Sequence, residues 1–475
     1  MKRKVDRISL QSAKSTKAIT AVKRYGEAFA AEKGHLPRCY VLTFGCQQNV
    51  ADSEKLSGMA ELMGYEITER PDLADLILVN TCAIREHAEK RALSIVGQYK
   101  HLKEKNRDLI IGVCGCMVAQ EHRRDQLKRS YPYVDFVLGT SVLHRLPSIL
   151  AQRLAQRRRL FDGEEEHAIV EQVPIRRESD YRAWVSIMYG CNNFCSYCIV
   201  PYVRGRERSR APEDVIAEVK DLVARGYKDI TLLGQNVNSY GKDEGHGVDF
   251  AELLARLDAI EGDFILRFMT SHPKDATRRL VDVMAEGKHI AHHFHLPLQS
   301  GSDRILKAMN RHYDREGYLA ILDYMRAKMP DVAVTSDIIV AFPGETDIDF
   351  EETLYMLRRV KFDMLYSFIY SPRKGTPAAE MEGQIPKEVA SERFERLLAL
   401  QERMALAVNR PLVDTEQRVL CDGPSKTDAG MLSGRNSQNK IVFFEDDGTR
   451  AGEWVTVKIE RMTAFALYGK KIEKN

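Results

Sequence analysis

The sequence has no hydrophobic run of the length that a transmembrane helix needs. Its 475 residues are 44% hydrophobic and 29% charged, but no stretch of about 18 apolar residues occurs. The basic N-terminus also lacks the apolar segment of a secretory signal peptide. These absences predict a cytoplasmic protein without a membrane segment, and the length predicts roughly two to four domains.

The sequence also has little excess charge, so the net charge of +3 gives no indication of a nucleic-acid partner. Basic residues are concentrated locally instead. Residues 1–37 carry nine Lys and Arg against three acidic residues, with few recurring apolar positions. We interpret this segment as a basic N-terminal arm, mobile or loosely docked, and a solvated tail without a role is the alternative.

Residues 38–150 alternate short apolar runs with amphipathic stretches, which predicts an open and mostly parallel α/β sheet. The expected strands are 40–44, 76–79, 109–113 and 136–138, and the expected helices are 52–63, 86–103 and 117–130. Cys46, Cys82 and Cys116 each follow one of the first three strands. Because ligands bind beyond the carboxyl ends of parallel strands, we expect these cysteines to converge.

A charged segment, residues 151–180, has no clear period and is interpreted as a linker. Residues 181–410 then repeat strand and helix. The expected strands are 184–189, 230–233, 265–269, 294–298, 332–342 and 365–370. Six such units are two fewer than a closed barrel contains, so the pattern predicts a partial (β/α)6 barrel with its site at the strand C-termini.

The last segment, residues 411–475, clusters β-forming residues between turn signals and has no long helical pattern. The expected strands are 418–420, 441–444, 454–459 and 465–468. This composition predicts a small five-stranded antiparallel β-barrel, of a kind that often binds nucleic acid. The fold class is therefore α/β with an added C-terminal β-barrel.

The most specific motif is Cys191-x3-Cys195-x2-Cys198, directly after the first strand of the partial barrel. Three thiolates from one loop suit three irons of a [4Fe–4S] cluster and leave the fourth iron open. Zinc is the alternative, but a structural zinc site needs four ligands, and no histidine lies between residues 168 and 245.

This loop and barrel resemble the radical S-adenosylmethionine (SAM) superfamily. The resemblance implies that the open iron chelates SAM and that Tyr197 lies near its adenine. Polar residues at or near the strand ends are further candidates for contact with SAM or adenosine: Gln235, Asn236, Gln299 and Asp337. The neighbouring His292, His293 and His295 could bind a metal, but barrel residues are the favoured interpretation.

The contexts of Cys46, Cys82 and Cys116 resemble the methylthiotransferases within that superfamily, whose N-terminal domain holds a second [4Fe–4S] cluster. Cys116 matches the family's Gly-Cys pair better than Cys114, and we interpret Cys39, Cys114 and Cys421 as structural. The motif from Cys46 to Glu54 is most similar to the MiaB type, although Gln48 stands where Met is more usual. The C-terminal barrel resembles a TRAM domain, an RNA-binding module.

Basic residues supply the expected RNA contacts. Arg204, Arg206, Arg208 and Arg210 alternate after the cysteine loop, and Arg435 and Lys440 lie in an expected polar, glycine-containing loop of the C-terminal barrel, residues 433–440. Alternate spacing would place the four arginines on one side of an extended chain, facing phosphates. Internal pairing with acidic residues is the alternative.

The resemblance implies methylthiolation of C2 of N6-isopentenyladenosine at position 37 of tRNA. It implies two SAM molecules, two [4Fe–4S] clusters, the tRNA anticodon stem-loop as partner, and an electron donor such as flavodoxin or ferredoxin. One alternative keeps the chemistry and changes the substrate to threonylcarbamoyl-adenosine or a ribosomal protein. Another is a non-catalytic iron–sulfur RNA-binding protein.

Overall fold

The computed structural model describes residues 7–472, except 11, 85, 162–165, 167, 244–246 and 429. By its contacts the chain divides into two compact units. The first unit contains residues 1–178, 188–192 and 199–210, and the second contains 179–187, 193–198 and 211–475. The chain therefore passes from the first unit to the second and back within the segment that carries Cys191, Cys195 and Cys198.

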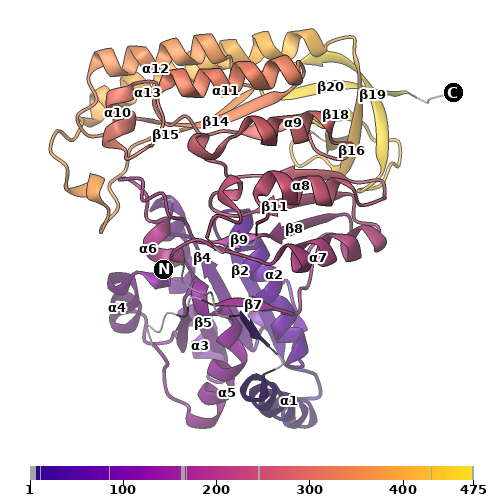
Figure 1. The fold of residues 1–475 in the computed structure, drawn as a ribbon. Coiled ribbons are helices and arrows are strands. Elements are labelled where there is room, and N and C mark those ends of the chain that lie inside the picture. The colour runs from indigo at the N-terminus through magenta and orange to yellow at the C-terminus, as the bar shows by residue number, and fades with distance from the viewer. Residues whose placement is uncertain are drawn as a thin grey trace. The chain divides into compact units, whose positions relative to one another are not determined.

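The first unit is built on a parallel five-stranded sheet in the order β3-β2-β4-β5-β6 (Figure 1). Its strands are β2 (Arg38–Thr43), β3 (Glu66–Ile67), β4 (Leu76–Thr81), β5 (Ile110–Gly115) and β6 (Phe136–Leu138). Every residue of β4 and β5 is buried. Such continuous apolar runs are typical of strands covered on both faces, and the predicted open parallel sheet is confirmed.

Helices cover both faces of this sheet. They are α1 (Ala13–Lys33), α2 (Gln47–Leu62), α3 (Glu86–Lys105), α4 (Glu121–Ser130) and α5 (Leu146–Gln156), with the 3-10 turns η1 (Pro71–Leu73), η2 (Met117–Ala119) and η3 (Thr140–Arg145). One apolar core joins α1, α2 and α5 to the sheet through residues such as Val22, Leu56 and Leu150. A second core joins α3 and α4 through Val96 and Leu127.

The described part of the basic N-terminal segment is more ordered than the sequence suggests. Helix α1 begins after Ser12, whose side chain accepts a bond from the Ser15 amide, and ends at Gly34 with a φ of 78°. It packs against α5 by burying the small residues Ala18, Val22 and Gly26. Residues 7–33 are therefore not a loose arm, whereas Lys2, Arg3 and Lys4 lie outside the described residues.

Strands also occur where a linker was expected. β1 (Arg7–Ser9) pairs in parallel with β7 (Ile169–Glu171), inside the 151–180 segment. Residues on either side of the cysteine motif complete the first unit. They form the antiparallel pair β9 (Met188–Tyr189), before the motif, and β10 (Arg208–Ser209), after it, together with the short helix α6 (Val200–Arg204).

The second unit contains the partial barrel as two parallel three-stranded sheets, β12-β11-β8 and β13-β14-β15. The strands are β8 (Arg182–Ser186), β11 (Asp229–Leu233), β12 (Ile265–Phe268), β13 (His293–His295), β14 (Ala333–Val340) and β15 (Met364–Ile369). All six strands coincide with the predicted ones, and main-chain bonds of Leu266 with His289 and Ala291 continue the first sheet towards β13.

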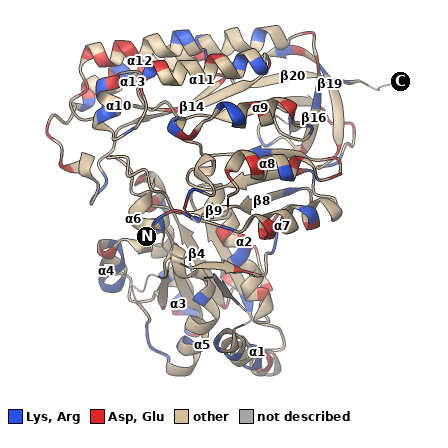
Figure 2. Ribbon diagram, in the orientation of Figure 1, with Lys and Arg blue, Asp and Glu red and all other residues tan. Residues whose placement is uncertain are grey.

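Helices follow the strands of this barrel. They are α7 (Pro212–Ala224), α8 (Phe250–Asp258), α9 (Arg278–Glu286), α10 (Asp303–Ala308), α11 (Arg315–Lys328), α12 (Asp347–Val360) and α13 (Lys387–Asn409). The 3-10 turns are η4 (Val237–Ser239), η5 (Pro273–Asp275), η6 (Pro377–Glu380) and η7 (Arg410–Leu412). Helix α12 has acidic residues in its first turn and Arg358 and Arg359 in its last, which suits the helix dipole (Figure 2).

The C-terminal segment forms a closed barrel in the order β16-β17-β18-β20-β19. The strands are β16 (Glu416–Pro424), β17 (Met431–Arg435), β18 (Ile441–Glu445), β19 (Trp454–Met462) and β20 (Ala466–Ile472). Four ladders are antiparallel, and β18 pairs with β20 in parallel. Strand β17 covers Ser433–Arg435, which we expected to lie in a loop.

A buried carboxylate links this C-terminal barrel to the parallel strands of the same unit. Asp229 accepts bonds from Arg182 at 2.9 Å and from Arg267 at 3.2 Å. Arg182 also donates to Asp422 of β16 at 2.6 Å, and Arg267 donates to the carbonyl of Asn436 at 3.0 Å. Asp229 therefore balances two guanidinium groups that reach the C-terminal barrel.

No helix among the described residues is long and apolar enough to cross a membrane, which agrees with the absence of a long apolar run in the sequence.

We predict that Asp229→Asn destabilises the second unit by about 3–5 kcal/mol, because it leaves buried Arg267 without its carboxylate partner and removes one of the two carboxylates bound to Arg182. Urea unfolding of the full chain measures this change. Asp221→Asn on the exposed face of α7 removes an i,i+4 pair and is the matched control, with an expected change below about 0.5 kcal/mol. Equal midpoints for the two variants would contradict the role of Asp229.

Candidate functional site

Three cysteines lie at the carboxyl edge of three adjacent strands in the first unit. Cys46 follows β2, Cys82 follows β4 directly, and Cys116 follows β5 directly. The strands are neighbours in the order β2-β4-β5 and run in parallel, so their ends share one edge of the sheet. The structure therefore places Cys46, Cys82 and Cys116 at one site, where their mutual proximity acts on the Cys116 thiol.

Two glycines allow the three loops to approach one another. Gly45 has a φ of 119°, and a Cβ atom there would lie 2.7 Å from the Cβ of Cys82. Gly115 has a φ of 97°, and its Cβ would lie 2.4 Å from the Thr81 carbonyl oxygen. Both positions need the left-handed backbone region and leave no room for a side chain. The Gly-Cys pairs are thus a steric requirement of the site.

Buried amides fix the loops in place. The Asn49 side chain donates to the carbonyls of Phe44 at 2.9 Å and Thr81 at 2.8 Å. The Asn80 side chain donates to the Asn49 carbonyl and to the Ser53 hydroxyl, both at 2.9 Å. These bonds tie the start of α2 to the ends of β2 and β4, so the cysteine positions are rigid before any ligand binds.

An arginine from the segment after the cysteine motif completes this site. The Arg204 guanidinium donates to Asp52 Oδ2 at 2.8 Å and to Asn49 Oδ1 at 3.1 Å, and both ion-paired side chains are 5% exposed. Asn49 Oδ1 also lies 3.6 Å from Cys46 Sγ. Ile199 and Val203 of the same segment pack with Ala83 and Cys116. Residues 199–204 thus form one wall of the site.

The electrostatics of the site favour bound anions. Burial raises the pKa of the Cys116 thiol to about 12, and the Arg204 charge opposes that rise. Burial would lower the pKa of Arg204, but Cys116, Asp52 and Cys46 raise it above its ordinary value. The guanidinium therefore stays charged beside three thiols. Such a donor set fits a [4Fe–4S] cluster, whose ligands must be thiolates.

The Cys191-x3-Cys195-x2-Cys198 loop is anchored in each unit separately. In the first unit the Cys191 amide donates to the Gly205 carbonyl at 3.1 Å. In the second unit the Ser196 amide and hydroxyl donate to the carbonyls of Met309 and Ala308 at 3.0 and 2.9 Å. The eight-residue loop therefore has a defined backbone at both ends.

Arg311 is the charged neighbour of this loop in the second unit. Its guanidinium lies 3.3 Å from Cys195 Sγ and donates to the Pro297 carbonyl at 3.0 Å. Burial lowers its pKa, but the proximity of Tyr313, Tyr197 and Cys195 raises it well above the usual value. A permanent cation at this position can balance the negative charge that a bound cluster would bring to the loop.

Polar groups without partners collect at the ends of the barrel strands. Of the fourteen buried side-chain atoms without a hydrogen-bond partner among the described residues, five follow strands of the barrel: Asn236 Oδ1, Ser271 Oγ, His272 Nε2, Gln299 Oε1 and Tyr370 OH. Thr270, Gln299 and Ala341, also after strands, have φ values of 59–68°. Strained backbone and unsatisfied polar atoms at strand C-termini are typical of a ligand site, and they suit the polar groups of SAM.

The candidate SAM residues occupy different positions around these strand ends. Asn236 is buried and donates to Asp275 at 2.7 Å, while Gln235 is half-buried. Gln299 and Asp337 are linked through a main-chain bond of 2.8 Å. Tyr197 packs with Ile305, Met309, Phe342 and Ala378 in a small apolar cluster.

Most of the residues chosen for RNA contact also have partners inside the protein. Arg204 binds Asp52, Arg210 binds Glu171 at 2.7 Å, and buried Arg208 donates to the carbonyls of Arg206 and Arg204. Arg206 is exposed. In the C-terminal barrel, half-buried Lys440 binds Asp363 at 2.5 Å, and half-buried Arg435 donates to Asn439 and lies 3.6 Å from Asp422. Pairing with acidic side chains, the alternative interpretation for the loop arginines, is seen for Arg204 and Arg210.

The three histidines of the fourth strand region have partners within the second unit. His292 bonds Asp331 at 2.9 Å, and His293 and His295 share the Thr335 hydroxyl at 3.0 Å. Within the part of the chain that the structure describes, no three His, Cys, Asp or Glu side chains form a site for one metal ion.

Sequence reasoning missed the polar residues that support the cysteines. Asn49 and Asp52 lie three residues apart at the start of α2, a spacing that puts them on one helix face beside the site. That spacing was a usable signal. No such spacing signal exists for Arg311 and His272, because the residues beside them at the site are distant in sequence.

Three segments of the chain match known families. Residues 38–139 match a family described as uncharacterized protein family UPF0004, residues 185–357 match the radical SAM superfamily, and residues 412–472 match the TRAM domain. The fold is similar to that of the radical SAM methyltransferase TsrM from Kitasatospora setae, with a TM-score of 0.53 and 14% identity over 84% of this chain and 81% of that one.

Close relatives cover almost the whole chain. The tRNA-2-methylthio-N(6)-dimethylallyladenosine synthase of Thermoanaerobacter sp. (strain X514) is 49% identical over 91% of this chain and 92% of its own length. The synthase of the same name from Caldicellulosiruptor saccharolyticus is 47% identical over 96% of each chain. Identity of this extent, over all three matched segments, shows that the chain belongs to the tRNA-2-methylthio-N6-dimethylallyladenosine synthase family of radical SAM enzymes.

Proposed function

We propose that the chain replaces the C2 hydrogen of N6-dimethylallyladenosine at position 37 of tRNA with a methylthio group. The observation that carries the proposal is the trio Cys46, Cys82 and Cys116 beside buried Arg204, in a chain that belongs to this synthase family. The alternative substrates, threonylcarbamoyl-adenosine and a ribosomal protein, are not supported by the names of these relatives.

The adenine C2–H bond explains why the reaction needs a radical enzyme. No side-chain base ionises that bond usefully near neutral pH. SAM bound to a [4Fe–4S] cluster supplies a 5′-deoxyadenosyl radical that can remove the hydrogen atom. The protein residues then bind, orient and exclude water. In the second unit, Asn236, Gln299 and His272 offer buried polar atoms for SAM, and Arg311 compensates the charge at Cys195.

The first unit would supply sulfur to the reaction. Cys46, Cys82 and Cys116 would hold the second cluster through three irons, which leaves one iron for a sulfur ligand. Arg204 would compensate the negative charge of thiolates and sulfur, and Asp52 and Asn49 would hold its guanidinium in place. Membership of the radical SAM superfamily implies one [4Fe–4S] cluster and SAM. The second cluster is supported by the geometry of the three cysteines in the first unit.

The C-terminal barrel would bind the anticodon stem-loop through its outer surface. Arg461 lies 3.5 Å from the Tyr468 ring centroid, and Tyr468 stacks on Phe443 at 5.1 Å. Phe465, in the turn between β19 and β20, is 65% exposed. Aromatic faces with an adjacent cation are suited to stacking on bases and holding phosphate, so this surface replaces Arg435 and Lys440 as the expected RNA contact.

We predict that alanine at Cys191, Cys195 and Cys198 abolishes both 5′-deoxyadenosine and methylthio product. Alanine at Cys46, Cys82 and Cys116 should abolish the methylthio product alone, because those cysteines follow strands of another domain. Chromatography of an anaerobic reaction of dimethylallylated tRNA, SAM and reductant measures both. Cys114→Ala, two residues from Cys116, is the control and should retain both products. Methylthiolated tRNA from the Cys46/Cys82/Cys116 variant would refute the assignment.

We predict that Arg204→Met speeds iron loss from the first-unit site to a chelator by about 10–100-fold, the usual effect of removing a supporting residue from a metal site. The measurement uses protein that lacks Cys191, Cys195 and Cys198, so that only this cluster is present, with about four irons at the start. Exposed Arg206→Met is the matched control. Equal rates for the two variants would contradict the role of Arg204.

We predict that Arg461→Ala and Phe465→Ala each raise the Kd for tRNA about 5–100-fold, the effect of losing one stacking contact. Filter binding at several salt concentrations measures this change, and Arg461→Ala should also lower the salt dependence. Exposed Arg225→Ala on α7 is the control. An unchanged Kd in both variants would exclude this surface as the RNA contact.

A further inference from the structure

Two aromatic rings are exposed on one face of the second parallel sheet of the barrel. The sheet register pairs Asp337 and Ile339 of β14 with Tyr366 and Phe368 of β15. Paired residues of neighbouring strands point to the same side, so these four side chains share one face, which we call the inner face. Tyr366 and Phe368 are 39% and 36% exposed. Nothing in the proposed reaction has used this face so far.

The opposite face of the same sheet is closed. Helix α13 packs against β14 and β15, and the β14 residues of that face are fully buried: Val334, Ser336, Ile338 and Val340. On the side of the inner face, Thr335, Met364 and Tyr366 line a cavity towards the C-terminal barrel. Packed side chains therefore do not fill the inner face, as they fill the interior of a closed barrel.

The inner face carries the carboxylate of Asp337. Asp337 Oδ2 lies 3.7 Å from His295 Nε2, and the Asp337 side chain is 28% exposed. His295 bonds the Thr335 hydroxyl at 3.0 Å, and its ring centroid lies 5.7 Å from that of Tyr366. Among the described residues, no lysine or arginine lies within ion-pair distance of Asp337. The carboxylate therefore brings negative charge to a largely aromatic surface.

The inner face ends at the candidate SAM contacts. The Gln299 amide donates to the Asp337 carbonyl at 2.8 Å, and the Ile339 amide donates to the Gln299 carbonyl at 2.9 Å. Gln299 Oε1 and the hydroxyl of Tyr370, two residues beyond Phe368, are among the unpaired buried atoms that suit SAM. A radical formed from SAM reacts only with an atom held beside it, so the substrate base is needed next to these strand ends.

The chemistry of the inner face distinguishes between N6 groups of adenosine. Dimethylallyl is a branched, neutral hydrocarbon, which suits the side chains of Ile339, Tyr366 and Phe368, and the rings can also stack on the purine. The Asp337 carboxylate can accept a hydrogen bond from the remaining N6–H group. Threonylcarbamoyl carries a carboxylate of its own, and a second negative charge beside Asp337 is unfavourable.

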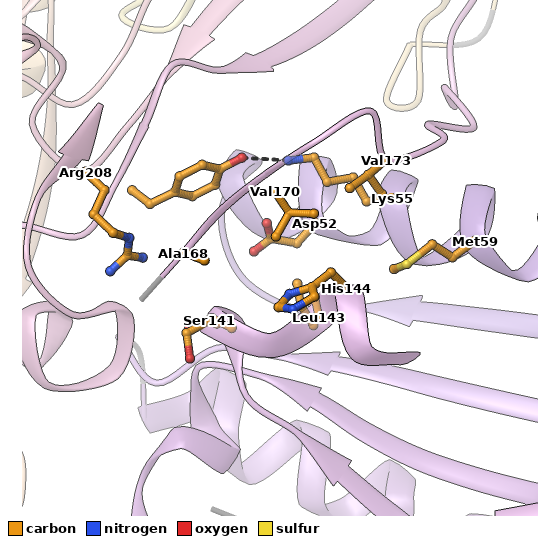
Figure 3. A pocket seen from close by; sticks show the side chains of 12 residues that line it. Asp52, Lys55, Met59, Ser141, Leu143, His144, Ala168, Val170, Val173 and Arg208 are labelled. Atoms are coloured by element: carbon orange, nitrogen blue, oxygen red, sulfur yellow. Dashed lines mark hydrogen bonds between the residues drawn. The ribbon is translucent and has the colours of Figure 1, made fainter. Parts of the chain in front are cut away.

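The cavity beside α2 in the first unit does not suit such a base. Its volume is about 60 Å³, far below the roughly 300–1,000 Å³ of a small-molecule site (Figure 3). Two of its charged side chains already have partners, since Lys55 donates to the Tyr189 hydroxyl at 2.7 Å and Asp52 binds Arg204 at 2.8 Å. A modified adenine is therefore better matched by the inner face of the second unit.

We infer that the inner face binds the N6-dimethylallyl base, with Phe368, Tyr366 and Ile339 against its hydrocarbon group and ring, and that Asp337 excludes threonylcarbamoyl-adenosine. The inference rests on the proposed function, because it names the residues that select the substrate of that reaction. These residues determine specificity, in addition to the residues that hold the clusters and SAM. Binding at the inner face involves no covalent step.

Binding of modified stem-loops tests the inference directly. The full, reconstituted chain with SAM is titrated with anticodon stem-loops that differ only at N6 of adenosine 37: unmodified, dimethylallyl or threonylcarbamoyl. The wild type should bind the dimethylallyl form at least about tenfold more tightly than the unmodified form, because an apolar site gains from each added carbon.

The aromatic residues should carry this preference. Phe368→Ala and Tyr366→Ala should each bring the ratio of the two Kd values close to one, whereas Phe368→Leu, which keeps an apolar side chain, should retain most of it. Tyr355→Ala, at an exposed ring of α12, is the matched control and should leave the ratio unchanged. A wild-type ratio near one, or a wild-type ratio in both alanine variants of the inner face, would overturn the inference.

Asp337→Asn tests the exclusion of threonylcarbamoyl. The amide keeps the size of the side chain and an oxygen that accepts the N6–H bond, but it removes the charge. The Kd for the threonylcarbamoyl stem-loop should fall about tenfold or more, and the Kd for the dimethylallyl stem-loop should change less than about threefold. Asp323→Asn, at an exposed carboxylate of α11, is the control and should change neither value. An unchanged Kd for the threonylcarbamoyl stem-loop would overturn the role of Asp337, whether or not an alanine variant folds.

Product analysis of the same reactions separates the inference from the proposed function. A wild type that prefers the dimethylallyl stem-loop through Phe368 and Tyr366 but forms no methylthio product would refute the function and leave the base site standing. Normal product formation, with a preference that both alanine substitutions leave unchanged, would refute the base site and leave the function standing. The replaced side chains are partly exposed, so the variants should keep the melting temperature and iron content of the wild type.

Discussion

The ion pair between Arg204 and Asp52 is the interaction on which the candidate auxiliary site depends. Both side chains are buried, and the guanidinium also bonds Asn49, which in turn holds the loops after β2 and β4. A buried pair of this kind is not a large source of stability, since desolvation offsets much of the attraction. Its consequence is geometric: it fixes a cation at a defined place beside three thiols.

The position of Arg204 in the chain links this ion pair to the cysteine motif that precedes it. Arg204 follows Cys198 by only a few residues, yet it belongs to the first unit with Asp52. The backbone of the same segment accepts a bond from the Cys191 amide at Gly205. One short stretch of chain therefore contributes to the surroundings of both cysteine trios.

The sequence was sufficient for most strands of the parallel sheets and for the cysteine positions, because both depend on local pattern. Buried parallel strands appear as continuous apolar runs, and a cysteine directly after such a run must lie at the carboxyl edge of the sheet. Helix α1 was missed because it buries small residues such as Ala18 and Gly26 rather than a broad apolar stripe. Strand β17 was missed because Ser433 and Gly434 are weak β-formers.

The arginines show where local pattern fails. Alternation after the cysteine loop predicted an exposed basic strip, but the partners of these residues come from elsewhere: Asp52 lies 152 residues before Arg204, and Glu171 lies 39 residues before Arg210. No spacing rule reveals such pairs. The residues that remain available for RNA are those whose charge or aromatic ring is not engaged within the fold. The outer surface of the C-terminal barrel is therefore the better candidate for RNA contact.

The central claim is that this chain adds the methylthio group to N6-dimethylallyladenosine of tRNA. Mass spectrometry of tRNA nucleosides from cells with and without the gene tests it most directly. Loss of 2-methylthio-N6-dimethylallyladenosine, with accumulation of N6-dimethylallyladenosine and recovery on re-expression, is the predicted result. Unchanged levels of that nucleoside, or loss of the threonylcarbamoyl counterpart instead, would contradict the claim.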